Sequence, residues 1–200
     1  MKRRIIHAAV LAAGLLASGP VFATPPSAEM LSFNCASCHG YEGVSVGPAT
    51  PSLAGMPEEY FIMSMLDYQD GRRPATVMDR IAAGYTEKEI EIMAGYFASL
   101  QYRPAPQSFD ATLASRGAEL HANNCERCHS ENATVPEEDS MVLAGQWLPY
   151  LRNSMRDFKD HNRAQPSRMQ RNTADLSDDD LEALLHFYAS QQQPELFVQR

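Results

Sequence analysis

The chain has 200 residues, 44% of them hydrophobic and 21% charged, with 11 glycines and 13 prolines, a composition typical of a globular protein and not of a disordered or fibrous one. Its formal net charge of −8 argues against a nucleic-acid partner, because binding to a phosphate backbone requires a basic surface. No apolar run reaches the roughly 18 to 20 residues that a membrane span requires, so we expect no transmembrane segment.

Residues 1–23 have the organisation of a signal peptide. Basic residues at positions 2–4 precede a largely apolar stretch over residues 5–17, and small residues follow where a signal peptidase cleaves. We therefore expect cleavage after Ala23 and export to the periplasm. A retained membrane anchor is disfavoured because the apolar stretch is short.

The first half of the exported chain has the apolar periodicity of helices, and no segment alternates as a strand does. We expect a first helix from about residue 27, a middle helix that includes residues 61–68, and a closing helix over residues 86–100. Thr86 and Glu89 have the spacing of a capping box at the start of the closing helix. The expected fold class is therefore all-α.

A proline-rich segment, residues 101–107, follows the closing helix. Pro104 and Pro106 favour a stiff, extended linker there, because proline removes a backbone donor and fixes φ. We expect this linker to separate an N-terminal domain of residues 24–100 from a C-terminal domain of residues 108–200.

The second half repeats the first. The aligned segments are residues 35–39 with 125–129, 53–55 with 143–145 and, after one inserted residue, 96–99 with 187–190. One duplication explains both halves. It predicts three corresponding helices in the second half. The first begins near residue 111, the middle helix includes residues 151–158, and the closing helix covers residues 177–191.

All four cysteines belong to two C-x-x-C-H motifs, a pattern that places two thiols about one helical turn apart. Each thiol can then form a thioether with a vinyl group of haem while the adjacent histidine faces the iron. A zinc ribbon is disfavoured because its cysteine pairs are typically about 15 to 20 residues apart, and a thioredoxin-like pair because no strand precedes the first motif. We expect two covalent haem c groups. Their attachment residues are Cys35, Cys38, Cys125 and Cys128, and their axial histidines are His39 and His129.

A methionine is the expected sixth ligand of each iron, since His39 is the only histidine of the first exported half. Two methionine pairs recur in the repeat, Met65 with Met155 and Met78 with Met169. The first pair lies in the apolar stripe of the middle helices, where methionine usually fills the core. Met78 and Met169, in expected loops, are therefore the predicted ligands.

The second half contains three histidines besides His129. His161 and His186 remain alternatives to Met169 as the sixth ligand, and His121 is expected on a helix surface. Ligation by histidine and methionine fills both axial positions, and the chain offers no paired carboxylates or nucleophile with its base. We therefore expect it to carry electrons without catalysing a reaction alone.

Several runs of sequence resemble the dihaem cytochrome subunit of flavocytochrome c sulfide dehydrogenase, a duplicated class I cytochrome c. The resemblance covers essentially the whole exported chain and is most specific around Gly47, Arg80 and Trp147. The segments that carry it are residues 29–31, 34–36, 45–49, 80–85, 93–97, 125–129 and 143–147.

This resemblance implies two tandem cytochrome c domains related by an approximate twofold axis. It also implies a heterodimer with a flavoprotein that holds FAD and oxidises sulfide, and a soluble cytochrome c as electron acceptor. Met78 and Met169 match the family's ligand positions, and Pro48 resembles the proline whose carbonyl orients the axial histidine.

Some alternatives remain open. A stand-alone periplasmic dihaem carrier that donates electrons to a terminal oxidase would share the fold, the haems and the compartment. A dihaem peroxidase is disfavoured because it needs a vacant iron position. Tyr60, Tyr150 and Trp147 have two open roles, as hydrogen-bond partners of haem propionates or as buried aromatic residues.

Overall fold

The structure, a computed structural model, describes residues 26–137 and 139–197, and this part of the chain is helical with no β-strand. The prediction of an all-α fold is confirmed. The signal peptide and its cleavage site lie outside the described residues. The helices are α2 (Ala28–Phe33), α3 (Ala36–His39), α4 (Glu58–Gln69), α5 (Met78–Ala82), α6 (Glu87–Ala98), α7 (Ala111–Asn124), α8 (Ser130–Ala133), α9 (Leu148–Lys159), α10 (Ser167–Ala174) and α11 (Asp178–Ser190), with 3₁₀ turns η1 (Tyr41–Gly43) and η2 (Pro194–Phe197).

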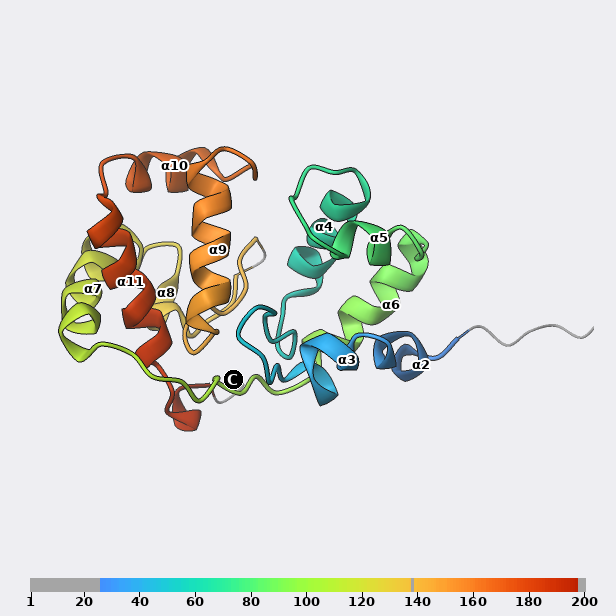
Figure 1. Cartoon of the computed structure of the whole chain (residues 1–200). Coiled ribbons are helices and arrows are strands. Elements are labelled where there is room, and N and C mark those ends of the chain that lie inside the picture. Colours follow the sequence, from blue (N-terminus) through green and yellow to red (C-terminus); the bar gives the residue numbers. More distant parts are fainter. Residues whose placement is uncertain (1–25, 138, 198–200) are drawn as a thin grey trace, which may run out of the picture.

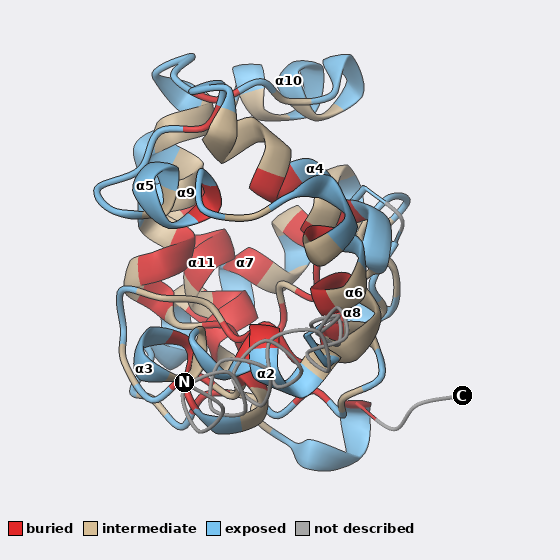
Figure 2. Cartoon of the chain, turned by 90° about the vertical axis from the view of Figure 1, so that its right-hand side faces the viewer, coloured by how far each residue is buried: buried red, intermediate tan, exposed pale blue. Residues whose placement is uncertain are grey.

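Two groups of helices, α2 to α6 and α7 to α11, lie side by side and are joined by an extended segment (Figure 1). Buried residues gather on α6 in the first group and on α7 and α11 in the second, whereas the residues of α10 itself are mainly exposed (Figure 2). Within the described ranges, no helix has the length and apolarity to span a membrane.

Side-chain caps fix the predicted helix starts. The Thr86 hydroxyl accepts from the backbone N–H of Glu89 and the Glu89 carboxylate accepts in return, so the expected capping box is present at α6. Ser177 and Asp180 form the corresponding box at α11. These bonds satisfy N–H groups that have no partner within the helix.

The linker is extended and contains no helix, as predicted, but it packs against the second half. The backbone N–H of Ala105 donates to the carbonyl of Gly145 at 2.7 Å. Tyr102 is buried in a small cluster with Val142, Ala144 and Phe197. These contacts fix the direction in which the chain enters the second half, whereas the boundary residues of the two domains stay a prediction.

Close packing of α7 on α11 corrects one expectation. His121 is not on a helix surface, since its side chain is only 1% exposed and its Nδ1 lies 3.1 Å from the Tyr188 hydroxyl. The absence of a side chain at Gly117 lets α11 approach closely enough to cover the imidazole. Glu126 then contacts Nε2, a partner that helical periodicity does not reveal.

Candidate functional site

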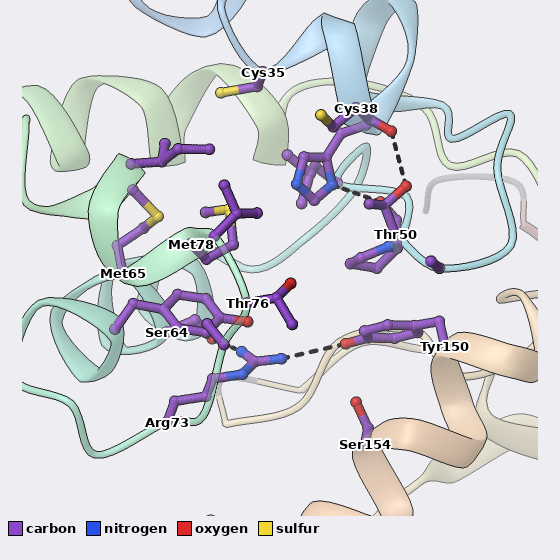
Figure 3. Close-up of a pocket in the computed structure, with 18 of the residues that line it drawn as sticks. Cys35, Cys38, Thr50, Ser64, Met65, Arg73, Thr76, Met78, Tyr150 and Ser154 are labelled. Carbon is purple, nitrogen blue, oxygen red and sulfur yellow. Dashed lines mark hydrogen bonds between the residues drawn. The ribbon is translucent and has the colours of Figure 1, made fainter.

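A cavity of about 500 Å³ is lined mainly by the first half, including the first C-x-x-C-H motif, and on one side by Tyr150 and other residues of α9 (Leu148–Lys159). The two cysteines enter from the turn of α3, whereas Met65 enters from α4 and Met78 from α5 (Figure 3). Most of the remaining lining is apolar or aromatic, as in sites that hold a large hydrophobic ligand. The structure therefore gathers the predicted residues of the first half around one space.

The first cysteine-bearing segment is the single helical turn α3. Cys35 is the N-cap of α3 and Cys38 lies within it, so their thiols are separated by one turn. Burial raises the pKa of the Cys35 thiol to about 11, which keeps that thiol protonated at neutral pH. Burial also lowers the pKa of His39, which keeps its imidazole neutral and able to bind a metal ion.

The partner of His39 corrects the assignment of Pro48. His39 Nδ1 lies 2.8 Å from the carbonyl oxygen of Pro51, so a neutral imidazole donates there and leaves Nε2 free as a ligand. The Ser45 hydroxyl contacts the carbonyls of Gly47 and Thr50, which folds this loop into a compact turn. Pro48 lies within this turn, and the carbonyl group that contacts the imidazole is that of Pro51, which follows the turn.

The structure brings both candidate methionines of the first half to the cavity. Met65 is 5% exposed and packs in the core, as expected, and it also lines the cavity wall. Met78 is half-buried and is the first residue of α5, where a loop was expected. The cavity lining alone does not decide between the two sulfur atoms.

The second half carries the corresponding residues, but its C-x-x-C-H motif lies in a turn between α7 and α8 and not in a helix like α3. Cys125 ends α7 and is half-buried, and burial raises the pKa of its thiol. Burial lowers the pKa of His129, as it does for His39. Met169 is half-buried within α10, again on a helix and not in a loop.

The two other histidines considered as ligands have different surroundings. His161 is exposed, in a left-handed conformation at the end of α9. His186 Nδ1 accepts from the backbone N–H of Asp110 at 2.9 Å, and its Nε2 lies 3.3 Å from Glu182. His186 therefore stabilises the start of α7.

Two buried arginines connect the halves, and the sequence analysis missed both. Arg73 is 7% exposed and donates across the interface to the Tyr150 hydroxyl at 3.4 Å. Arg163 is 9% exposed and donates to the Tyr60 hydroxyl at 2.9 Å. Each arginine and each tyrosine recurs at the same position of the repeat, so the two contacts are reciprocal. This exchange is the geometry expected of two halves related by an approximate twofold axis.

These arginines hydrogen-bond neutral hydroxyl groups. Arg73 also donates to Ser64 at 2.8 Å and borders the cavity (Figure 3). Burial alone would raise the pKa of Tyr60, but the two guanidinium groups outweigh burial and lower it. A buried cation with only neutral partners favours an additional anion nearby. Their recurrence in the repeat was the signal that would have found them.

The residues that line the first cavity fit haem c. The first cavity combines two thiols, which can attach haem c through thioether bonds, with a neutral histidine and methionine sulfurs, which are the iron ligands of cytochromes c. Arg73 at its border suits a haem propionate, because guanidinium groups bind carboxylates in a fixed planar geometry. The hydroxyls of Tyr60 and Tyr150, considered as propionate partners, each accept from an arginine, and Trp147 Nε1 donates to the Ser45 carbonyl at 3.3 Å.

Comparisons with known proteins agree with this description. A family model described as cytochrome c oxidase, cbb3-type, subunit III matches residues 112–187. The chain is 42% identical over 99 residues to the cytochrome subunit of sulfide dehydrogenase from Chlorobaculum tepidum, an alignment that covers 43% of this chain and 89% of that protein. It is 32% identical over 174 residues to the thiosulfate dehydrogenase electron acceptor of Thiomonas intermedia, covering 81% of this chain and 78% of that protein.

A solved structure shows the same arrangement of two halves. Reduced cytochrome c4 from Pseudomonas stutzeri superposes with a TM-score of 0.73 and 26% sequence identity. The superposition covers 84% of this chain and 100% of that chain, so both halves have counterparts there.

Proposed function

We propose that this chain, which belongs to the dihaem class I cytochromes c, is the electron-transfer subunit of a periplasmic sulfide dehydrogenase. It accepts electrons from a separate flavoprotein that holds FAD and passes them to a soluble cytochrome c. The observation that carries this proposal is the cavity where Cys35, Cys38, His39 and Met78 meet, together with the second C-x-x-C-H motif of the repeat. The identity to a sulfide dehydrogenase cytochrome subunit supports the choice of partner.

Each proposed site residue has a distinct task. The bound group supplies reversible one-electron chemistry at its iron. Cys35 and Cys38 would hold it covalently, and the Pro51 carbonyl fixes the ring of His39 so that Nε2 would be free to bind the iron. Met78 would supply the other ligand from the protein and exclude water. Cys125, Cys128, His129 and Met169 have the same tasks in the second half.

Two one-electron sites in one chain match a two-electron donor. Oxidation of sulfide by a flavin releases two electrons, and each half of the chain accepts one. The two sites are held in one body by the reciprocal Arg73–Tyr150 and Arg163–Tyr60 contacts. Tight coupling of the halves suits rapid exchange of electrons between them.

Arg73 is expected to raise the reduction potential of the first half. A buried cation near the iron favours the reduced form, so Arg73→Gln should lower this potential by tens of millivolts, on the order expected for one charge at a partly buried site. Spectroelectrochemical titration of the purified protein measures the effect. Arg80→Gln is the matched control, because its side chain is 78% exposed. Equal shifts in the two variants would contradict this role for Arg73.

The partner is tested by size-exclusion chromatography of native periplasmic extract with haem and flavin absorbance followed together. We expect both absorbances to elute together, well above the size of this chain alone, and sulfide to reduce the haem in that peak. Haem that elutes without flavin and does not respond to sulfide would exclude the flavoprotein partner.

The comparison with the Thiomonas protein favours a second candidate function, as electron acceptor of a thiosulfate dehydrogenase. That relative aligns with 81% of this chain, against 43% for the sulfide dehydrogenase subunit. The same extract distinguishes the two functions, because thiosulfate would then reduce the haem in a fraction that contains no flavin. Failure of both substrates would favour a carrier that serves a terminal oxidase.

A further inference from the structure

The two halves hold their C-x-x-C-H histidines in different ways. In the first half, His39 Nδ1 lies 2.8 Å from the carbonyl oxygen of Pro51. In the second half, His129 Nδ1 lies 3.1 Å from the hydroxyl oxygen of Ser140. The repeat puts Met141 at the position of Pro51, so the second half lacks the proline that serves the first.

The hydrogen bonds around Ser140 have a consistent direction. A histidine that binds a metal through Nε2 carries its proton on Nδ1, so His129 donates to the Ser140 oxygen. The Ser140 hydroxyl then donates to the carbonyl oxygen of Met141 at 3.2 Å. The Ser140 backbone is itself fixed by two reciprocal bonds with Glu137, each 3.0 Å long. The serine is therefore held in place as an acceptor.

The matching residue of the first half has another role. Thr50 stands where the repeat places Ser140, and its hydroxyl donates to the carbonyl oxygen of Cys38 at 2.8 Å. The Thr50 hydroxyl also contacts Ser45 at 3.2 Å. A hydroxyl group at this position therefore serves the loop in one half and the axial histidine in the other.

We propose that Ser140 is the positioning residue of His129. Because its hydroxyl takes the role that the Pro51 carbonyl has for His39, this contact gives the second iron a higher reduction potential than the first. A carbonyl at the shorter distance draws the Nδ1 proton more strongly and makes the imidazole a more basic ligand. A more basic ligand stabilises the oxidised iron and lowers the potential. The longer hydrogen bond from His129 to the Ser140 hydroxyl lowers the potential less. The inference rests on the part of the proposed function that assigns haem to His129, and not on sulfide or a flavoprotein.

The test compares Ser140→Ala, Ser140→Thr and Thr50→Ala in the full-length protein with both haems attached. Redox titration followed by NMR resolves the two haems and needs no partner protein. Ser140→Ala should raise the potential of the second haem and change the equilibrium constant for electron exchange between the haems by about 2- to 10-fold, up to about 59 mV. Ser140→Thr retains the hydroxyl and should have the same two reduction potentials as the wild-type protein. Thr50→Ala should leave the second haem unchanged.

A measurement on the wild-type protein tests the proposal even if a variant fails to fold. In the reduced protein, the Nδ1 proton of His129 should resonate at higher field than that of His39, because its hydrogen bond is weaker. Reversed or equal proton shifts would overturn the proposal. The proposal would also be overturned if Ser140→Ala and Thr50→Ala changed the potential of the second haem equally, or if Ser140→Thr changed that potential as much as Ser140→Ala does. Loss of sulfide response with these potentials retained would reject the sulfide dehydrogenase function alone.

Discussion

Met78→Ala is expected to leave the first iron without its sixth ligand and to create one carbon monoxide site per chain. Removal of the thioether also lowers the potential of that haem, since a methionine ligand raises it. Absorbance titration of the reduced protein with carbon monoxide counts the new sites. Met169→Ala is expected to have the same effect in the second half.

Met65→Leu is the matched control, because Met65 lines the same cavity and is buried in the core. Leucine has a similar volume, so we expect a loss of less than about 1.5 kcal/mol in the free energy of unfolding. No carbon monoxide should bind. A Met65→Leu variant that binds carbon monoxide, beside a Met78→Ala variant that does not, would transfer the ligand role to Met65.

Gly117→Ala is expected to lower the free energy of unfolding by about 3 kcal/mol or more. A Cβ atom at this position would lie 2.1 Å from the carbonyl oxygen of Ala183 and 2.7 Å from Cβ of Phe187, so α7 and α11 would have to separate. In an ordinary helix, this substitution instead stabilises by up to about 1 kcal/mol. Denaturant unfolding followed by circular dichroism at a helical wavelength measures the change.

Gly47→Ala provides the comparison, since a Cβ atom there meets nothing within 4 Å. We expect its unfolding free energy to stay within about 0.5 kcal/mol of the wild-type value. Similar losses in both variants would show that the contact between α7 and α11 does not limit the stability of the second half.

Local features of the fold could be predicted because neighbouring residues determine them. Thr86 and Glu89 form a capping box within one helical turn, and Cys35 and Cys38 are separated by one turn of α3. The duplication then extended each assignment from one half to the other. The first cavity accordingly contains the cysteine, histidine and methionine side chains that the motif and the repeat selected.

Long-range contacts could not be predicted in the same way. Pro48 was chosen as the histidine partner, but the turn stabilised by Ser45 moves that role to Pro51. His121 was placed on a surface, but the small volume of Gly117 brings α11 over it. Each outcome depends on how closely two segments approach.

The helical class, the duplication and the residue types of the two haem sites could all be predicted, because they follow from periodicity and short spacings along the chain. The groups that complete those sites became visible only in the packed fold. Arg73 meets Tyr150, and Arg163 meets Tyr60, because the halves exchange contacts across their interface. The physical reason is that burial and hydrogen bonding depend on distances between segments that lie far apart along the chain.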